Sequence, residues 1–331
     1  MQLQEIRWGI IGCGDVCEVK SAPAMYKLPG SKVVAVMRRN AEKAADFARR
    51  HGVPKYYDNA PGLIADPEVN AVYIATPPDA HLSNALQVAA AGLPVYVEKP
   101  MARTFAECME MNAAFEQAGL PLFVAYYRRY LPNFVKIKSL VEDGAIGEVL
   151  SVDIQLIKSV SPDLIAKSEE NWRVQPERSG GGYFFDLASH QLDILDYFFG
   201  PVIWAAGKAV NRAGLYPAED LVTGAWSFEN GILGSGLWNF AAADLAQKEE
   251  MAITGSKGQI RFACFGKADV LLLRDGKAPE SLPFTYPQHI QMPMIEEVNA
   301  ALRGETTCRS TGISAARTNW VMEQICRKQE V

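Results

Sequence analysis

The stretch Ile10-Ile11-Gly12-Cys13-Gly14-Asp15-Val16-Cys17 lies where an apolar, strand-like pattern gives way to a helical one. Gly12 permits a tight turn, and Gly14 lets the backbone approach a ligand because it has no Cβ. Cys17 stands where a third small residue packs the helix against the strand. The pattern predicts a strand, a glycine turn and a helix, in that order.

The first 125 residues alternate strand and helix patterns. Strands are predicted at residues 6–12, 32–37, 71–76, 94–98 and 120–125, and helices at 41–51, 80–91 and 105–117. The strand runs are continuously apolar, which is typical of a parallel sheet covered on both faces. The sequence therefore predicts an α/β protein whose first domain, residues 1–125, is a Rossmann-type, doubly wound parallel sheet.

The pattern changes after residue 125. A long strand is predicted at 148–158, and an apolar helix at 183–199 follows Gly180-Gly181-Gly182. Residues 204–273 have the pattern of successive strands joined by turns such as Asn230-Gly231, which is a strong hairpin signal. Helices are expected near 294–303 and 313–327. We predict a second α/β domain, residues 126–331, with an antiparallel or mixed sheet.

Composition excludes several classes of protein. The chain has 331 residues, 49% apolar content and 21% charge, as expected for two globular domains. Its net charge of −5 argues against nucleic acid as a partner. No apolar run is long enough to span a membrane, and the amino end has no cationic leader. The cysteines lack metal-ligand spacing, so we expect reduced thiols, a cytoplasmic location and no metal site.

The glycine turn is a candidate dinucleotide site because it follows the first strand and opens the first helix. Its predicted cofactor-binding residues are Gly12, Cys13, Gly14, Asp15 and Val16. NAD sites usually carry an acid at the end of the second strand, whereas arginine accommodates the extra phosphate of NADP. Here Arg38 and Arg39 follow that strand, which favours NADP. The alternative is a solvated strand end with NAD bound without an acid.

Lys99 closes another predicted strand, within Glu98-Lys99-Pro100. Ligands bind at the carboxyl ends of strands in open α/β sheets, so a cation there is a candidate for handling a substrate oxygen. The alternative is a surface lysine that ends a strand.

Further along the chain, Asp186 and His190 have the i, i+4 spacing of one helix face. Imidazole can transfer a proton near neutral pH, and a carboxylate can orient it. The alternative is a buried structural pair.

Taken together, these motifs resemble the glucose–fructose oxidoreductase/inositol dehydrogenase (Gfo/Idh/MocA) family. The ordered motifs are Gly9-Ile10-Ile11-Gly12-Cys13-Gly14, Thr76-Pro77-Pro78-Asp79-Ala80-His81, Glu98-Lys99-Pro100, Arg128-Arg129, and Gly180-Gly181-Gly182 followed by Asp186, His190 and Asp193. The resemblance implies a Rossmann domain and a C-terminal α/β domain. The open, mainly antiparallel sheet of the latter often forms the oligomer interface. We therefore expect a homo-oligomer, a dimer or a tetramer.

The resemblance also implies residue roles. Lys99, Asp186 and His190 would form the catalytic set, with His190 as acid/base, Lys99 polarising the reacting oxygen and Asp186 supporting both. The residues that would line the cofactor are Thr76, Pro77, His81 and Glu98. Substrate contacts are expected from Tyr127, Trp172, Arg173 and Asp193. Tyr127 departs from the family pattern, because relatives commonly carry Asn there.

The function expected from these features is an NADP-dependent oxidoreductase, with NAD as the alternative cofactor. It would transfer hydride to or from a CH–OH or C=O carbon of a sugar, polyol or related cyclic compound. Two alternatives remain at this point. One is cleavage of glycosidic bonds by transient redox with tightly bound cofactor, and the other is a non-catalytic dinucleotide-binding regulator. The sequence does not identify the substrate.

Overall fold

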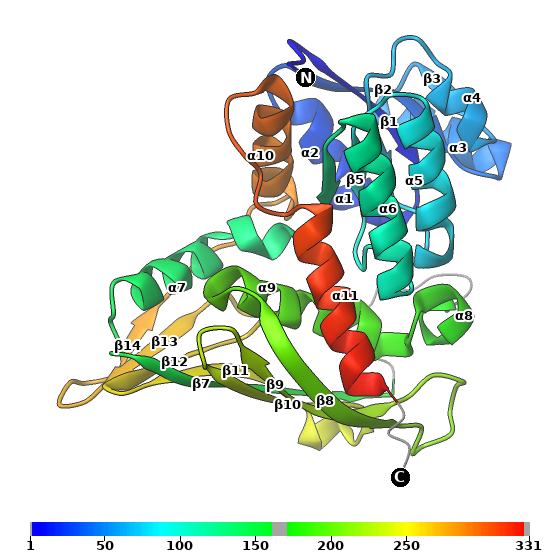
Figure 1. Cartoon of the computed structure of the whole chain (residues 1–331). Coiled ribbons are helices and arrows are strands. Elements are labelled where there is room, and N and C mark those ends of the chain that lie inside the picture. The colour runs from blue at the N-terminus through cyan, green and yellow to red at the C-terminus, as the bar shows by residue number, and fades with distance from the viewer. Residues whose placement is uncertain (1, 161–170, 328–331) are drawn as a thin grey trace. The chain divides into compact units, whose positions relative to one another are not determined.

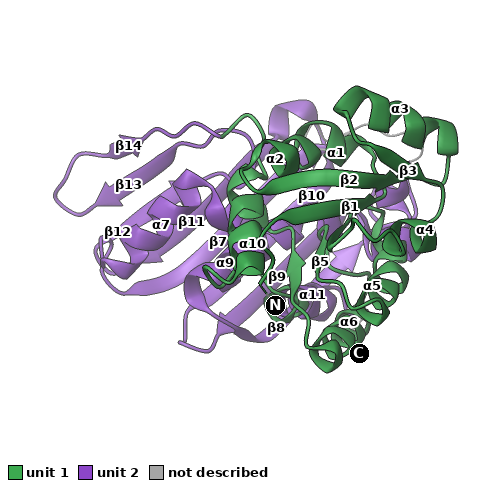
Figure 2. Ribbon diagram, turned by 90° about the horizontal axis from the view of Figure 1, so that it is seen from above, with its two compact units in different colours: residues 1–127, 287–316 green, residues 128–286, 317–331 purple. Residues whose placement is uncertain are grey.

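The structure is a computed structural model that describes residues 2–160 and 171–327 (Figure 1). The chain divides into two compact units, which Figure 2 shows in different colours. Unit 1 comprises Met1–Tyr127 and Pro287–Ala316, and unit 2 comprises Arg128–Tyr286 and Arg317–Val331. In the described part of the chain, no helix combines the length and the apolar character needed to cross a membrane.

Unit 1 contains a six-stranded parallel sheet in the order β3-β2-β1-β4-β5-β6. Its strands are β1 (Ile6–Ile11), β2 (Ser31–Met37), β3 (Lys55–Tyr57), β4 (Ala71–Ile74), β5 (Val95–Val97) and β6 (Leu122–Val124). This is the strand order of dinucleotide-binding folds, in which β1 and β4 flank the crevice that receives the ligand. The predicted Rossmann sheet is confirmed. The sequence reading missed only the short strand β3.

Helices connect these strands, and local capping explains their bounds. They are α1 (Asp15–Val19), α2 (Ala22–Lys27), α3 (Ala41–His51), α4 (Ala60–Ile64), the 3₁₀ turn η1 (Pro78–Ala80), α5 (His81–Ala90) and α6 (Phe105–Ala118). The side chain of Asn40 accepts a hydrogen bond from the Lys43 N–H at the start of α3, and Thr104 does the same for α6. Both helices end at glycines with positive φ, Gly52 and Gly119.

The predicted domain boundary differs from the observed division in two respects, since Tyr126 and Tyr127 lie in unit 1 and so does a later segment. Residues 287–316, assigned from sequence to the second domain, pack in unit 1. They include α10 (Met292–Arg303), which lies against α2, and the start of α11 (Gly312–Cys326). The N–H of Val124 donates to the carbonyl of Ser310 at 3.1 Å, extending the hydrogen bonding beside β6. This return of the chain depends on long-range contacts that local patterns do not encode.

Unit 2 is built on an eight-stranded sheet in the order β14-β13-β12-β11-β7-β10-β9-β8. Its strands are β7 (Val149–Ser159), β8 (Val202–Val210), β9 (Leu221–Phe228), β10 (Leu233–Ala242), β11 (Lys248–Gly255), β12 (Gly258–Phe262), β13 (Val270–Arg274) and β14 (Glu280–Leu282). Among the described strands of this sheet, only β7 and β10 pair in parallel. The expected mainly antiparallel sheet is confirmed.

The two faces of this sheet differ. Figure 1 shows α7 (Pro132–Glu142) and α9 (Ser189–Phe199) along one face. Large side chains such as Trp226 and Trp238 are buried on it. Glycines make room there, since a Cβ on Gly234 would lie 2.1 Å from the Trp226 ring, and one on Gly224 would lie 2.9 Å from Ile325 of α11. The opposite face carries exposed residues, including Trp204 and Leu233.

The predicted helix at 183–199 has an interruption. Phe184–Ala188 forms a π-helical turn, and α9 follows it directly. Single π turns inside helices are rare and occur frequently at functional sites. Asp186 lies in the π turn and His190 in the first turn of α9. The two residues are four apart but belong to helical turns of different type.

Candidate active site

The glycine turn of unit 1 lies between β1 and α1. Gly12 has a φ of +90°, and a Cβ there would lie 2.8 Å from the backbone nitrogen of Thr76. The N–H groups of Gly12 and Cys13 donate to the carbonyl of Met37 at 2.9 and 3.1 Å. Gly12 therefore fits because the ends of β1, β2 and β4 converge on this turn.

Two observations show that this turn fits a dinucleotide. A Cβ on Gly14 would meet only the carbonyl oxygen of Gly12, at 3.9 Å, so the backbone there is open to close approach. The hydroxyl of Thr76 is buried and has no hydrogen-bond partner among the described residues. A bound phosphate or ribose could satisfy that hydroxyl. The turn leads directly into α1 at Asp15 and Val16, as the phosphate-binding pattern requires.

The thiols beside the turn are not suited to nucleophilic chemistry. Burial raises the pKa of Cys13 to about 11, although the nearby guanidinium of Arg38 lowers it. Burial also raises the pKa of Cys17 well above its usual value. Both side chains are therefore neutral thiols near pH 7, and thiols react as thiolates. Cys17 fills the small-residue position at the base of α1.

The end of β2 presents cationic side chains. Arg38 is half-buried and Arg39 is exposed. Asn40 is occupied as the N-cap of α3. The segment thus offers two guanidinium groups and no carboxylate at the position where dinucleotide-binding sheets contact the ribose next to adenine.

His81 connects the loops that follow β4 and β5. Its Nε2 lies 2.7 Å from the carbonyl oxygen of Thr76, and its Nδ1 lies 3.2 Å from the carbonyl oxygens of both Pro100 and Met101. Burial lowers the pKa of this imidazole. The ring is wholly buried. His81 therefore braces two loops at the carboxyl edge of the sheet, and Pro77 begins the η1 turn between Thr76 and His81.

Lys99 directly follows Glu98 at the end of β5, and its peptide bond to Pro100 is cis. The Glu98 carboxylate is buried and accepts three hydrogen bonds. The donors are the Tyr73 hydroxyl at 2.6 Å, the side-chain amide of Gln291 at 2.7 Å and the backbone N–H of Lys99 at 3.2 Å. Glu98 thereby fixes the backbone from which the half-buried Lys99 side chain starts.

In unit 2, Asp186 has a cationic neighbour that the sequence did not indicate. Nε of Arg173 lies 3.1 Å from a carboxylate oxygen of Asp186. The guanidinium of Arg173 also stacks over the ring of Trp172, 4.5 Å from its centroid. Trp172 and Arg173 belong to the short turn η3 (Trp172–Val174). Arg173, predicted as a substrate contact, thus connects this turn to Asp186.

His190 is only 4% exposed. The ring of Phe265 packs edge-on against the imidazole, with centroids 5.8 Å apart. The guanidinium of Arg128 stacks over the same phenyl ring, 4.5 Å from its centroid. Phe265 therefore forms part of the apolar surroundings of His190.

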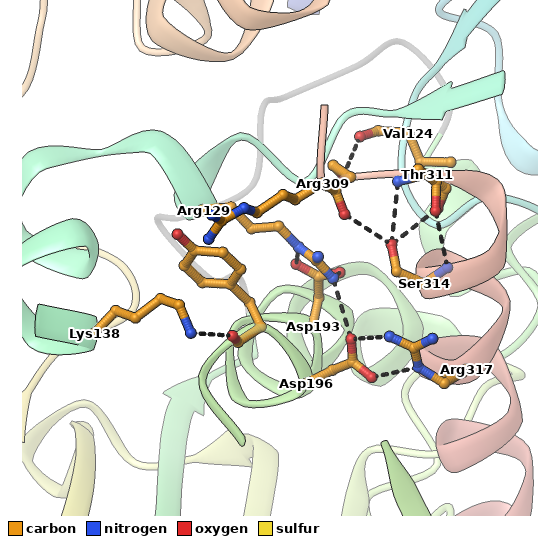
Figure 3. Close-up of polar contacts among 11 residues, drawn as sticks. Val124, Arg129, Lys138, Asp193, Asp196, Arg309, Thr311, Ser314 and Arg317 are labelled. Atoms are coloured by element: carbon orange, nitrogen blue, oxygen red, sulfur yellow. Dashed lines mark hydrogen bonds and ion pairs between the residues drawn. The ribbon is translucent and has the colours of Figure 1, made fainter. Parts of the chain in front are cut away.

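Asp193, which the sequence predicts as a substrate contact, forms a buried ion pair. It is 1% exposed, and Nε and Nη2 of Arg129 donate to its two oxygens at 2.8 and 2.6 Å. Asp196 continues the network, since Arg317 donates to it twice, at 2.7 and 2.8 Å (Figure 3). Burial raises the pKa of Asp193 to about 6, while Arg129 lowers it, so the carboxylate is ionised at pH 7. Asp193 therefore forms a buried ion pair, and its predicted contact with the substrate stays a prediction.

Within unit 1, the structure brings Gly12, Thr76, His81 and Lys99 to one edge of the parallel sheet, together with Arg38. Tyr127, which ends the first segment of unit 1, is buried at the start of the η2 turn (Tyr127–Tyr130). Sequence reasoning missed Gln291, because nothing local marks it as a partner of Glu98. It also missed the pairing of Arg129 with Asp193, although both residues lie in motifs that had been noted.

Comparison with family models covers most of the chain. Residues 6–126 match the model described as an oxidoreductase family with an NAD-binding Rossmann fold, and residues 134–261 match the GFO/IDH/MocA C-terminal domain. The chain belongs to this family. The resemblance noted from the sequence motifs is thereby confirmed.

Individual relatives agree with this assignment. Oxidoreductase P35 of Formosa agariphila is 42% identical over 97% of this chain and 98% of its own length. The 1,5-anhydro-D-fructose reductase of Ensifer adhaerens is 25% identical over 92% and 91% of the two chains. Among solved structures, a levoglucosan dehydrogenase in complex with NADH and levoglucosan has a TM-score of 0.87 at 23% identity, covering 97% and 96% of the chains. That likeness shows the shared fold. Family membership makes this chain an NAD(P)-dependent oxidoreductase.

Proposed function

We propose that the protein is a dehydrogenase or reductase that acts on a CH–OH or C=O carbon of a sugar, polyol or related cyclic compound. The observation that carries this proposal is the position of Lys99, two residues after the end of β5 and at the sheet edge that holds the Gly12–Gly14 turn. The names of two relatives, a 1,5-anhydro-D-fructose reductase and a levoglucosan dehydrogenase, support the sugar class.

A bound nicotinamide supplies the hydride acceptor or donor in such a reaction. The chain's own residues handle the proton and the charge on oxygen. During oxidation, His190 takes the hydroxyl proton, and the ammonium group of Lys99 stabilises the negative charge that develops on the oxygen. Asp186, held by Arg173, supports both groups. During reduction, His190 returns the proton to the oxygen.

A screen of sugars, polyols, inositols and dihydrodiols tests this proposal. We expect at least one compound to reduce free NADP or NAD steadily, measured as absorbance of the reduced nicotinamide. Turnover of a glycoside without net cofactor reduction would instead support transient redox. Tight dinucleotide binding without turnover of any compound would support a regulator.

We propose that NADP is the preferred cofactor, because Arg38 and Arg39 end β2 without a carboxylate. NADPH should therefore bind with a lower Kd than NADH, measured by nicotinamide fluorescence. Replacing both arginines by alanine should raise the Kd for NADPH by about tenfold or more, since a charge-assisted hydrogen bond contributes about 1.5–3 kcal/mol. The Kd for NADH should change little.

Arg49→Ala is the matched control for that experiment. Arg49 is an exposed arginine on α3 that pairs with Asp46, so this change also removes a positive charge. Its Kd for NADPH should stay near the wild-type value. Tighter binding of NADH by the wild-type protein would contradict the NADP assignment.

We further propose that the uncovered face of the unit 2 sheet forms a homo-oligomer interface. Trp204, Ser227 and Leu233 lie in register on this face, and Trp204 and Leu233 are 54% and 60% exposed. Light scattering should show a dimer or tetramer. Trp204→Asp with Leu233→Asp should reduce its mass, because charges would be buried in the contact.

Leu245→Asp provides the control for the interface. Leu245 is 95% exposed in the η5 turn (Asp244–Ala246) and lies outside the strands of the sheet. The mass should remain that of the wild-type oligomer. A wild-type protein that is monomeric at micromolar concentration would refute the interface.

A further inference from the structure

Gln291 is a wholly buried amide in the segment that returns to unit 1. It immediately precedes α10, yet its side chain makes no capping hydrogen bond to that helix. Its Nε2 donates to Oε1 of Glu98 at 2.7 Å, and its Oε1 accepts from the Tyr96 hydroxyl at 3.2 Å. An ionised carboxylate only accepts hydrogen bonds, so the amide nitrogen must face Glu98. The orientation of Gln291 is thereby fixed.

The surroundings of Glu98 leave few substitutes for this donor. Tyr73 donates to the same carboxylate oxygen, and its ring stacks on Tyr96 with centroids 5.2 Å apart. Other titratable groups near this carboxylate include the adjacent Lys99, Tyr96, Cys17 and His81. Burial raises the pKa of Cys17 and of Tyr73 and lowers that of His81, so these groups are neutral. Since a buried carboxylate requires hydrogen-bond donors, Gln291 and Tyr73 stabilise it together with the Lys99 N–H.

His289 anchors the segment that carries Gln291. Its Nδ1–H donates to the carbonyl of Val19 at the end of α1, at 2.7 Å. Its Nε2 lies 2.7 Å from Nζ of Lys27 and accepts from that ammonium group. His289 and Gln291 therefore attach one short stretch both to the helix after the glycine turn and to the carboxylate before Lys99.

We propose that Gln291 is a positioning residue for the reaction, a role that rests on the proposed function. Gln291 holds the Glu98 carboxylate, and Glu98 in turn accepts from the Lys99 N–H at 3.2 Å. The chain that returns from unit 2 thus sets the backbone from which Lys99 extends. Among the described residues, no hydrogen bond joins the Gln291 side chain to the glycine turn or to the end of β2, so we expect a smaller effect on dinucleotide affinity than on kcat.

The first test uses the free energy of unfolding to examine the contact between Gln291 and Glu98. In Gln291→Glu, two carboxylates would lie about as far apart as the present 2.7 Å contact, so the second of them would ionise only at a raised pKa. Below that pKa, the folded variant holds a proton that the unfolded chain releases above about pH 4.3. Its stability relative to wild type should therefore fall as pH rises from 5 to 8. For Gln291→Leu, the difference in free energy of unfolding from wild type should not vary over this pH range.

The second test measures kcat with the sugar that gives the highest wild-type rate. Gln291→Leu should lower kcat at least tenfold, with the dinucleotide Kd within threefold of wild type. In Gln291→Glu, the shared proton restores a donor, so kcat relative to wild type should recover as pH falls. A merely structural role would not produce this pH-dependent rescue. If Gln291→Leu does not fold, Gln291→Glu measured across pH decides the question.

Asn299→Leu is the control, because Asn299 is an equally buried amide in α10 without a hydrogen-bond partner among the described residues. Its kcat should match that of wild type. If the stability of Gln291→Glu relative to wild type did not fall as pH rises, the contact between Gln291 and Glu98 would be overturned. Wild-type kcat in both Gln291 variants would overturn the positioning role. Failure of the proposed function would be distinct, because the wild-type protein itself would then lack turnover.

Discussion

His190→Ala is expected to lower kcat by about 10²–10⁴-fold, the usual contribution of a positioned acid–base group. The dinucleotide Kd should stay near its wild-type value, because His190 belongs to unit 2 and the glycine turn to unit 1. Lys99→Ala should also lower kcat strongly, since it removes the cation that stabilises charge on the reacting oxygen. Steady-state kinetics and fluorescence titration measure the two quantities separately.

The pH profile distinguishes the two variants. Loss of His190 should remove the limb of the kcat profile that reports the acid–base group, whereas loss of Lys99 should leave that limb in place. His51→Ala is the control histidine, because His51 packs on Phe47 and contacts Glu18 within unit 1. It should keep near-wild-type kcat. Near-wild-type turnover in His190→Ala or in Lys99→Ala would refute the assigned role of that residue.

Asp193→Ala is expected to reduce the free energy of unfolding by about 3–5 kcal/mol, because it leaves the buried Arg129 guanidinium without its main partner. A Tm lower by roughly 10 °C should accompany this loss. Removing both charges, with Arg129→Met and Asp193→Leu, should recover much of the stability, since apolar side chains of similar volume can replace a buried pair.

An exposed ion pair gives the matched comparison. Glu280 pairs with Arg274 and is 46% exposed, so Glu280→Ala should cost less than about 1 kcal/mol. Denaturant unfolding measures both effects. If Asp193→Ala kept wild-type stability but lost kcat/KM, the ion pair would be unimportant and the predicted contact of Asp193 with the substrate would be supported.

Much of the fold was predictable because its signals are local. Gly12 and Gly14 follow an apolar strand directly, and Asn40 and Thr104 cap the helices they precede. Continuous apolar strands separated by helices require a parallel sheet, because both faces must be covered. The same regularity identified the strand ends, and thereby Arg38, Thr76 and Lys99 as neighbours at one sheet edge. These features depend on neighbours within a few residues.

The partners of the polar side chains were not predictable in the same way. Sequence gave no indication that Asp193 pairs with Arg129, 64 residues away. It gave no indication that Arg173 holds Asp186 or that Gln291, 193 residues from Glu98, donates to it. The sequence by itself thus determined most of the succession of strands and helices and the glycine turn, because hydrophobic periodicity and turn chemistry are local. Only the tertiary structure decided which buried charges meet, because each must find a partner wherever packing excludes water.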